Sequence, residues 1–245
     1  YKYNGTWNDG DWEGGGTQGN YRSFICEWGD YTVEVPDVNY ETDSETGETT
    51  ITSSAGTEAD IAIDSVYQGT LVTAIGDSAF RNDTTLTTMF IPNTVTSIGD
   101  YAFAGCTNLE EIVIPDSVTS IGIHAFDGCT SLKKVTLPST MTELPEYMFY
   151  GCTALEEVVY LDRITNIGAY AFYGCTSLAN ITYSEQLTTI GARAFYGCTS
   201  LTNGKLPNAV TSMGTYVFRD CTALTYLTIP TGLKSIPNYT FYNCT

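Results

Sequence analysis

The chain has 245 residues, 42% of them hydrophobic, and it carries 28 acidic against 10 basic residues, a formal net charge of −18. This composition is typical of a folded globular protein rather than of a disordered chain. The excess of negative charge argues against nucleic acid and anionic membrane surfaces as partners, because binding either requires Lys and Arg. No apolar stretch approaches the roughly 20 residues of a bilayer-spanning helix, so we expect no membrane insertion within this chain.

The N-terminal segment differs from the rest of the chain in charge and in amino-acid composition. Residues 1–70 hold 14 of the 28 acidic residues but only 2 of the 10 basic ones. Residues 1–20 are rich in Gly and Asn, which predicts a flexible leader. The sequence starts at Tyr1 without an initiator methionine or a signal-like apolar core, so we interpret it as a mature fragment.

Residues 21–70 are predicted to cap a repeat array. Residue types alternate in the manner of a strand at residues 31–35 and again at residues 49–52. An acidic turn region that ends at Gly47 joins the two stretches, which predicts a β-hairpin. Ile61 and Ile63 then match the strand positions of the repeat that follows. We expect this segment to cover the open sheet edge of the first coil.

Residues 71–245 consist of about eight 23-residue repeats. One cysteine column keeps this interval without exception: Cys106, Cys129, Cys152, Cys175, Cys198, Cys221 and Cys244. A phenylalanine column runs beside it: Phe80, Phe103, Phe126, Phe149, Phe172, Phe195, Phe218 and Phe241. The first repeat carries Asp83 where cysteine belongs. We expect the column cysteines to be buried free thiols, since no Cys-x-x-Cys or Cys/His pairing occurs. Cys26 lies outside the column and has no evident partner.

Each repeat predicts one short strand, followed by a segment, called here the arc, that leads the chain back to the next strand. The pattern Leu-x-x-apolar-x-apolar, as in Leu109, Ile112 and Ile114, is often followed by proline, which stops a strand. A second apolar pair, such as Val118 and Ile121, precedes the Ala-Phe segment and suits a turn or a short helix. A 23-residue unit buries its apolar side only by stacking, so the fold class is a solenoid.

Departures from the repeat are confined to single coils. Leu161 and Ser184 replace the strand-ending proline, and Gly204 occupies a strand core position. Pro145 and Pro237 replace the glycine of the arc. The chain also stops at Thr245, before the next strand; we expect either that more repeats or another domain follow, or that a partner covers this edge.

The pattern Ile-Gly-x-x-Ala-Phe-x-Gly-Cys-Thr-x-Leu, at residues 98–109 and 167–178, resembles the BspA-like leucine-rich repeat. The resemblance covers about residues 60–245. It implies a leucine-rich-repeat solenoid with a parallel sheet on the concave face, turns and short helices on the convex face, and an N-terminal β-hairpin cap. It also implies an extracellular or surface location, a bacterial source, and adhesion to host matrix or cells.

Two surfaces are candidates for ligand binding. The first, called here the strand face, is the outward side of the predicted sheet, and its selected residues are Phe90, Glu111, Val113, Lys134, Glu157, Val159 and Tyr226. The second, the tyrosine stripe, flanks the Ala-Phe segment and comprises Tyr147, Tyr150, Tyr170, Tyr173, Tyr196 and Tyr216. Its rigid aromatic rings suit contact with proteins or sugars, or they shield the arc by packing on one another.

The leading functional hypothesis is a non-enzymatic, secreted or cell-surface adhesion module that recognises an extracellular protein or a polysaccharide. The alternative is a structural spacer that presents another domain of a longer surface protein. We expect no catalytic residue, metal or cofactor, since no nucleophile–base pair or phosphate-binding loop stands out from the repeat. His124, the single histidine, occupies a tyrosine position and is interpreted as a solvent-facing variant.

Overall fold

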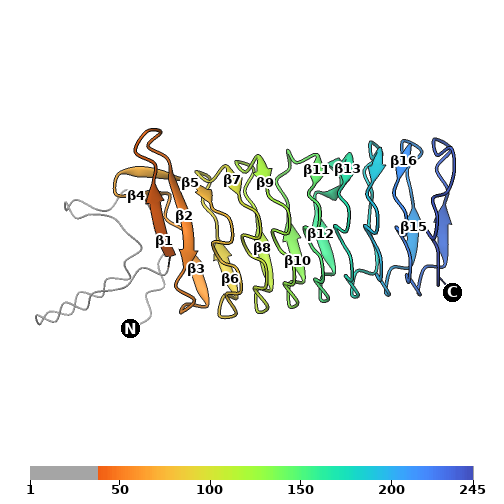
Figure 1. The fold of residues 1–245 in the computed structure, drawn as a ribbon, viewed down its shortest axis with the longest axis horizontal. Coiled ribbons are helices and arrows are strands. Elements are labelled where there is room, and N and C mark those ends of the chain that lie inside the picture. Colours follow the sequence, from red (N-terminus) through yellow and green to blue (C-terminus); the bar gives the residue numbers. More distant parts are fainter. Residues whose placement is uncertain (1–37, 245) are drawn as a thin grey trace, which may run out of the picture.

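The computed structural model describes residues 38–244. The predicted leader at 1–20, the predicted strand at 31–35 and Cys26 lie outside this range. The described chain forms a single row of stacked coils with the N-terminal strands at one end and the last coil at the other (Figure 1). Most coils contribute one strand to each of two parallel arrays, which confirms the solenoid.

The long-strand ladder is built from the predicted strands. Its members are three residues long: β3 (Asp60–Ala62), β6 (Thr88–Phe90), β8 (Glu111–Val113), β10 (Lys134–Thr136), β12 (Glu157–Val159), β15 (Asn203–Lys205) and β17 (Tyr226–Thr228). Paired strands are parallel. From β8 onward they align residues 23 apart, as in Lys134 opposite Glu111 and Glu157, whereas β3 and β6 align residues 28 apart, as in Asp60 opposite Thr88. The middle residue of β6, β8 and β10 is buried, and its neighbours point outward, as strand alternation requires.

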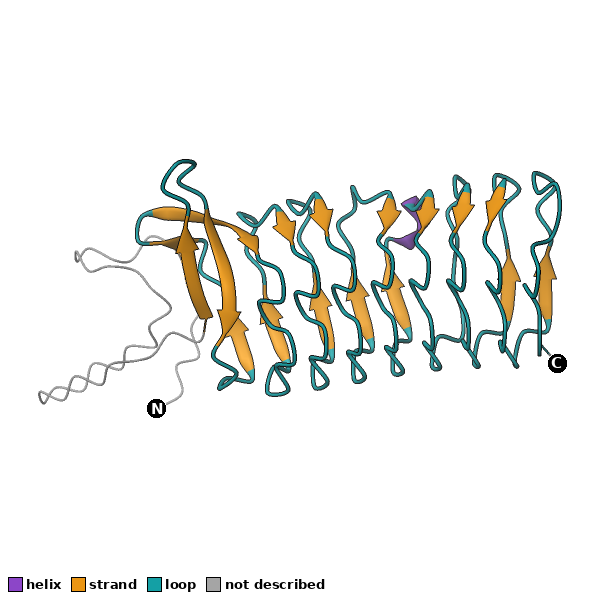
Figure 2. Cartoon of the chain, in the orientation of Figure 1, coloured by secondary structure: helices purple, strands orange, loops and turns teal. Residues whose placement is uncertain are grey.

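The arc holds a second ladder in place of the expected short helices. Its two-residue strands are β7 (Ser97–Ile98), β9 (Ser120–Ile121), β11 (Glu143–Leu144), β13 (Asn166–Ile167), β14 (Thr189–Ile190) and β16 (Ser212–Met213). β9 does not pair with β11, so the ladder consists of two runs, one ending at β9 and one from β11 to β16. Within the described residues the one helical element is the 3-10 turn η1 (Leu161–Arg163), drawn purple in Figure 2, and it lies outside the Ala-Phe segment. The expected turns are therefore present in the arc, whereas the expected short helices are not formed in its Ala-Phe segment.

Backbone conformation explains why the Ala-Phe segment does not form a helix. The residue two positions before each phenylalanine is left-handed in every coil, with φ of 57° at Tyr101 and 58° at Tyr170. L-amino acids form right-handed α-helices, so a residue in the left-handed conformation ends an α-helix. The segment therefore turns tightly around its buried phenylalanine.

The N-terminal strands extend the short-strand ladder. β1 (Val38–Thr42) pairs antiparallel with β2 (Thr49–Ser54), and β2 pairs in parallel with β5 (Thr70–Ile75). β4 (Val66–Tyr67) forms a small antiparallel pair with β5, which in turn continues to β7 and β9. The antiparallel partner of β2 in the structure is therefore residues 38–42, whereas the sequence predicted residues 31–35.

The core consists of the columns that the repeat predicted. The phenylalanine rings from Phe80 to Phe241 stack with centroids 5.2–6.0 Å apart. Each column cysteine donates its S–H to the carbonyl of the phenylalanine 26 residues earlier, as in Cys152 to Phe126 at 3.1 Å. The cysteines described are free thiols, buried except for the half-buried Cys244.

The buried thiols are expected to be inert toward thiol reagents in the folded protein. Burial raises the pKa of Cys106 and of Cys221 to about 12, and raises the pKa of Cys175 well above its usual value, so little thiolate exists at neutral pH. Within the cysteine column, site-resolved labelling with iodoacetamide should modify Cys244 first and the buried cysteines only after unfolding in urea. Rapid labelling of Cys152 or Cys175 in the native protein would contradict this assignment.

The long-strand ladder is interrupted between β6 and β8, which do not pair, and again in one later coil. Residues 180–182, which the repeat places beside β12 and β15, are not a strand, so the ladder of β8, β10 and β12 ends there and a new pair begins with β15 and β17. The interruption follows Leu161 and coincides with Ser184, both departures from the strand-ending proline. The short-strand ladder runs through this coil without a break, from β11 to β16.

Candidate functional site

The strand face displays the largest exposed apolar side chains of the long-strand ladder. Phe90 is 64% exposed, Val113 61% and Tyr226 60%. Phe90 and Val113 come from adjacent coils and line one hollow, whereas Tyr226 lies on β17, several coils away. A soluble surface rarely leaves neighbouring apolar side chains uncovered, so Phe90 and Val113 indicate a contact surface. Glu111 is exposed as well, whereas Val159 is half-buried.

Charge on the strand face is partly neutralised. Lys134 Nζ lies 2.9 Å from Glu157 Oε2 in the neighbouring strand, and this hydrogen bond raises the pKa of Lys134. Lys133 forms a similar pair with Glu110 at 2.8 Å. Both pairs are open to solvent, so they orient side chains on the surface more than they stabilise the fold.

A hollow of about 540 Å³ lies at the strand-ending side of β6, β8 and β10. Its wall includes Phe90, Val113 and Tyr160, with Asn93 and Asp116 at polar positions. Two of the strand-face residues selected from sequence therefore meet at this hollow. The other five do not line it: Glu111, Lys134, Glu157, Val159 and Tyr226.

A second hollow, of about 270 Å³, opens where the long-strand ladder is interrupted. Glu156, Glu157 and Asp162 contribute carboxylates to its wall, and Tyr160 and Asn180 complete the polar lining. No backbone hydrogen bond is formed across it between residues 157–159 and 180–182 of the described chain. Peptide groups facing this gap therefore remain available to a ligand.

Tyr160 lines both hollows and was missed by the sequence analysis. Its repeat position is the core position occupied elsewhere by Ile114 and Leu137, yet its backbone is left-handed at φ 67° and its side chain is 47% exposed. The next residue, Leu161, enters the core instead and is 5% exposed. The signal in the sequence was Leu161 itself, an apolar residue where proline normally stops the strand.

The tyrosine stripe consists of rings stacked on one another. Centroids are 4.5 Å apart for Tyr147 and Tyr170 and 4.7 Å apart for Tyr173 and its neighbours Tyr150 and Tyr196. Tyr216 stacks on Tyr239 at 4.9 Å. The guanidinium of Arg193 lies between Tyr170 and Tyr216, 5.3 and 4.8 Å from their ring centres. Because most ring faces are covered by a neighbour, the stripe offers a ligand chiefly ring edges and hydroxyls.

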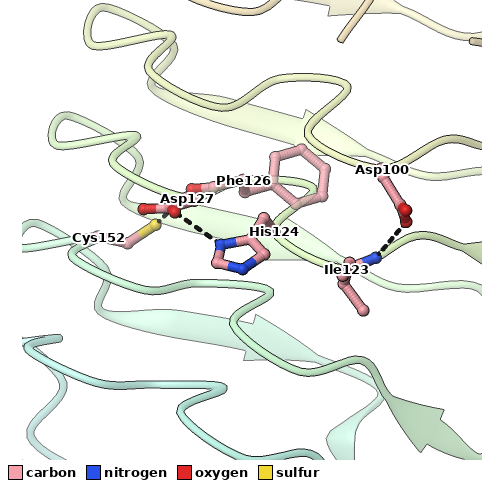
Figure 3. Close-up of polar contacts among 6 residues, drawn as sticks. All are labelled: Asp100, Ile123, His124, Phe126, Asp127 and Cys152. Carbon is pink, nitrogen blue, oxygen red and sulfur yellow. Dashed lines mark hydrogen bonds and ion pairs between the residues drawn. The ribbon is translucent and has the colours of Figure 1, made fainter. Parts of the chain in front are cut away.

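His124 is part of this stack. The sequence analysis interpreted it as solvent-facing, but in the structure it is largely covered. Its ring lies 4.4 Å from Tyr101 and 4.2 Å from Tyr147, centroid to centroid. Its Nδ1 lies 2.8 Å from Asp127 Oδ2, and only 17% of its side chain is exposed (Figure 3). The imidazole is flat like tyrosine, so it continues the column without interrupting the stacking.

Residues 38–244 contain neither a metal-ligand cluster nor a membrane-spanning helix. No group of three or more His, Cys, Asp or Glu side chains in that part of the chain is arranged to hold a metal ion. Over the same residues, no helix has the length and apolar character needed to cross a bilayer.

The chain matches one protein family and several solved structures. The family description "BspA type Leucine rich repeat region" matches residues 73–169 and 153–245, in six copies. A leucine rich cell surface protein of Faecalibacterium prausnitzii is 28% identical, with a TM-score of 0.54 over 86% of this chain and 57% of its own. A leucine-rich repeat protein of Eubacterium ventriosum is 25% identical, with a TM-score of 0.55 over 84% and 50%.

A third similar structure is the pneumococcal vaccine antigen PcpA, 25% identical with a TM-score of 0.52 over 75% of this chain and 53% of its own. The chain thus spans between half and three-fifths of these three structures. A comparison with curated proteins gave no match.

Proposed function

Since the chain belongs to the BspA type leucine-rich repeat family, we propose that it is a non-enzymatic binding module of a bacterial surface protein, and that the strand face carries its ligand site. The observation that supports this site is the group of exposed apolar side chains, Phe90, Val113 and Tyr160, around a hollow of about 540 Å³. Exposed aromatic and aliphatic groups beside a concavity are typical anchors for a partner.

The tyrosine stripe is a weaker candidate for the same role. Its rings are half-buried and stacked, and burial raises the pKa of Tyr147 and Tyr150. A sugar ring or an apolar side chain needs a free aromatic face, and the stripe's own neighbours occupy most of these. The stripe therefore shields the arc, while the strand face contacts the ligand.

Binding to a panel of immobilised extracellular matrix proteins and polysaccharides tests the proposal. The double variant Phe90→Ser, Val113→Asp should bind its target at least tenfold more weakly, because it removes two apolar anchors and adds a charge. Both positions are over 60% exposed, so the fold should remain intact. The matched control, Ile123→Asp, changes an apolar residue that is 42% exposed on the arc, and it should leave binding unchanged.

Two results would contradict the proposal. A loss of binding in Ile123→Asp together with normal binding by the double variant would move the site to the arc. No saturable binding to any member of the panel would favour the spacer, in which the solenoid only carries another domain.

A further inference from the structure

The two hollows on the strand face share one wall, and Tyr160 forms it. Building on the proposed function, we propose that they form a bipartite docking site for an extended protein segment. One hollow receives an apolar side chain of that segment, and the other receives a lysine or arginine side chain. Tyr160 lies between the two side chains and contacts both.

The exposed position of Tyr160 follows from local chain geometry. The left-handed Tyr160 turns its ring outward, and the 3-10 turn η1 that follows places Leu161 in the core. A tyrosine in this position presents a large rigid surface with a polar tip, at little cost in conformational entropy on binding. Tyrosine is also among the residues that most often dominate binding energy at protein interfaces.

The larger hollow has the character of an apolar subsite. Phe90 and Val113 come from adjacent coils, 23 residues apart, and their side chains are more than 60% exposed. Covering them together with Tyr160 removes apolar surface from water, which is the main favourable contribution to association. Asn93 and Asp116 are polar residues of the wall; Asp116 Oδ1 accepts the backbone N–H of Ser139 at 2.6 Å, so its second carboxylate oxygen is the one left for the backbone of a bound segment.

The smaller hollow has the character of a cation subsite. Three carboxylates line it, and of these only Glu157 forms an ion pair, with Lys134. In the described part of the chain, no basic side chain lies within ion-pair distance of Glu156 or Asp162. The whole protein is also strongly acidic, with a net charge of −18, so a basic partner is attracted at long range as well as at the site.

The gap in the long-strand ladder favours a peptide over a sugar chain. Residues 157–159 and 180–182 lack ladder hydrogen bonds to each other, so peptide groups on both sides are unpaired. An extended segment can satisfy such groups with its own backbone, as peptides do when they add to a sheet edge.

Fluorescence anisotropy with labelled twelve-residue peptides tests this site on the full chain. The probes carry one phenylalanine and two lysines at varied spacings, and matched peptides replace the lysines by glutamate or the phenylalanine by serine. We expect only peptides with both residue types to bind with saturation. Tyr160→Ala should weaken that binding at least tenfold, and Asp162→Asn should weaken it about threefold, with a smaller dependence on salt concentration.

The control is Glu143→Gln, which removes an exposed carboxylate of β11 on the other ladder and should leave peptide binding unchanged. Tyr160→Ser serves as a second variant if Tyr160→Ala proves unstable. Equal binding of the glutamate peptides, or unchanged binding by both Tyr160 variants, would overturn the bipartite site. Saturable binding to polysaccharides alone would also overturn it. If Phe90→Ser, Val113→Asp abolishes binding to the matrix panel while the Tyr160 variants do not, the proposed function stands and this inference fails.

Discussion

Replacing Phe195 by alanine is expected to lower the free energy of unfolding by about 3–5 kcal/mol. The ring is fully buried and stacks on Phe172 at 5.2 Å and on Phe218 at 5.4 Å, and Tyr183 contacts it edge-on at 5.8 Å. Truncation leaves a cavity between three coils that cannot collapse without separating them. Urea unfolding followed by circular dichroism measures the loss.

The position of Phe195 adds a second expected effect, on the cooperativity of unfolding. It belongs to the coil of residues 180–182, which lacks long-strand pairing on both sides, so the phenylalanine column carries more of the coupling between coils there. In a solenoid, stability is approximately a sum of coil and interface contributions, and weakening one interface uncouples the two ends. We therefore expect Phe195→Ala to unfold in two separate transitions.

Phe149→Ala is the matched control. Phe149 is equally buried, but its coil contains β10, which pairs with both β8 and β12. It should lose a similar free energy while keeping a single transition and an unchanged dependence on urea concentration. A single transition in both variants would contradict the view that the interrupted ladder weakens coupling at Phe195.

The repeat period predicted much of the core because it fixes which residues become neighbours. Once Cys106 and Cys129 are 23 residues apart in every coil, stacking brings them into one column, and the phenylalanines must follow. The same reasoning placed the outward residues of β8 and β10, including Glu111 and Val113, on one face. These inferences need only the spacing and the alternation of a strand.

The site depends on features that the period does not determine. Tyr160 and Tyr183 hold the same repeat position, and neither is followed by proline. Yet Tyr160 is 47% exposed while Tyr183 is 8% exposed, with its hydroxyl lacking a hydrogen-bond partner in the described structure. Leu161 and Ser184 are both buried, but Leu161 is large and apolar and fills the core in place of Tyr160, whereas the small Ser184 leaves that space to Tyr183. Which of two adjacent side chains enters the core depends on packing in three dimensions, and the spacing of the repeat does not predict it.

Restoring the repeat consensus with Asp83→Cys is expected to destabilise the protein by about 3 kcal/mol at pH 7. The residue 26 positions before Asp83 is Thr57, so the first column position has no phenylalanine carbonyl to receive a thiol. Asp83 instead accepts hydrogen bonds from Ser54 Oγ at 2.5 Å, from Thr85 Oγ1 at 2.6 Å, and from the backbone N–H groups of Thr85 and Leu86. A cysteine cannot replace a carboxylate as acceptor for these donors, and Asp83 is 6% exposed, so water does not replace it either.

The pH dependence separates this carboxylate from an ordinary packing residue. Burial raises the pKa of Asp83, but the hydrogen bonds from Ser54, Thr85 and Leu86 outweigh burial and lower the pKa below 3.8. A carboxyl whose folded pKa is lowered adds stability that is fully present above its unfolded pKa and is lost as the pH falls through the folded pKa. The stability difference between the wild type and Asp83→Asn should therefore be constant from pH 7 to pH 5 and shrink below about pH 4. Urea midpoints at pH 7, 5 and 3 measure it, and a difference that stays constant or grows in acid would show that Asp83 is not held as a carboxylate.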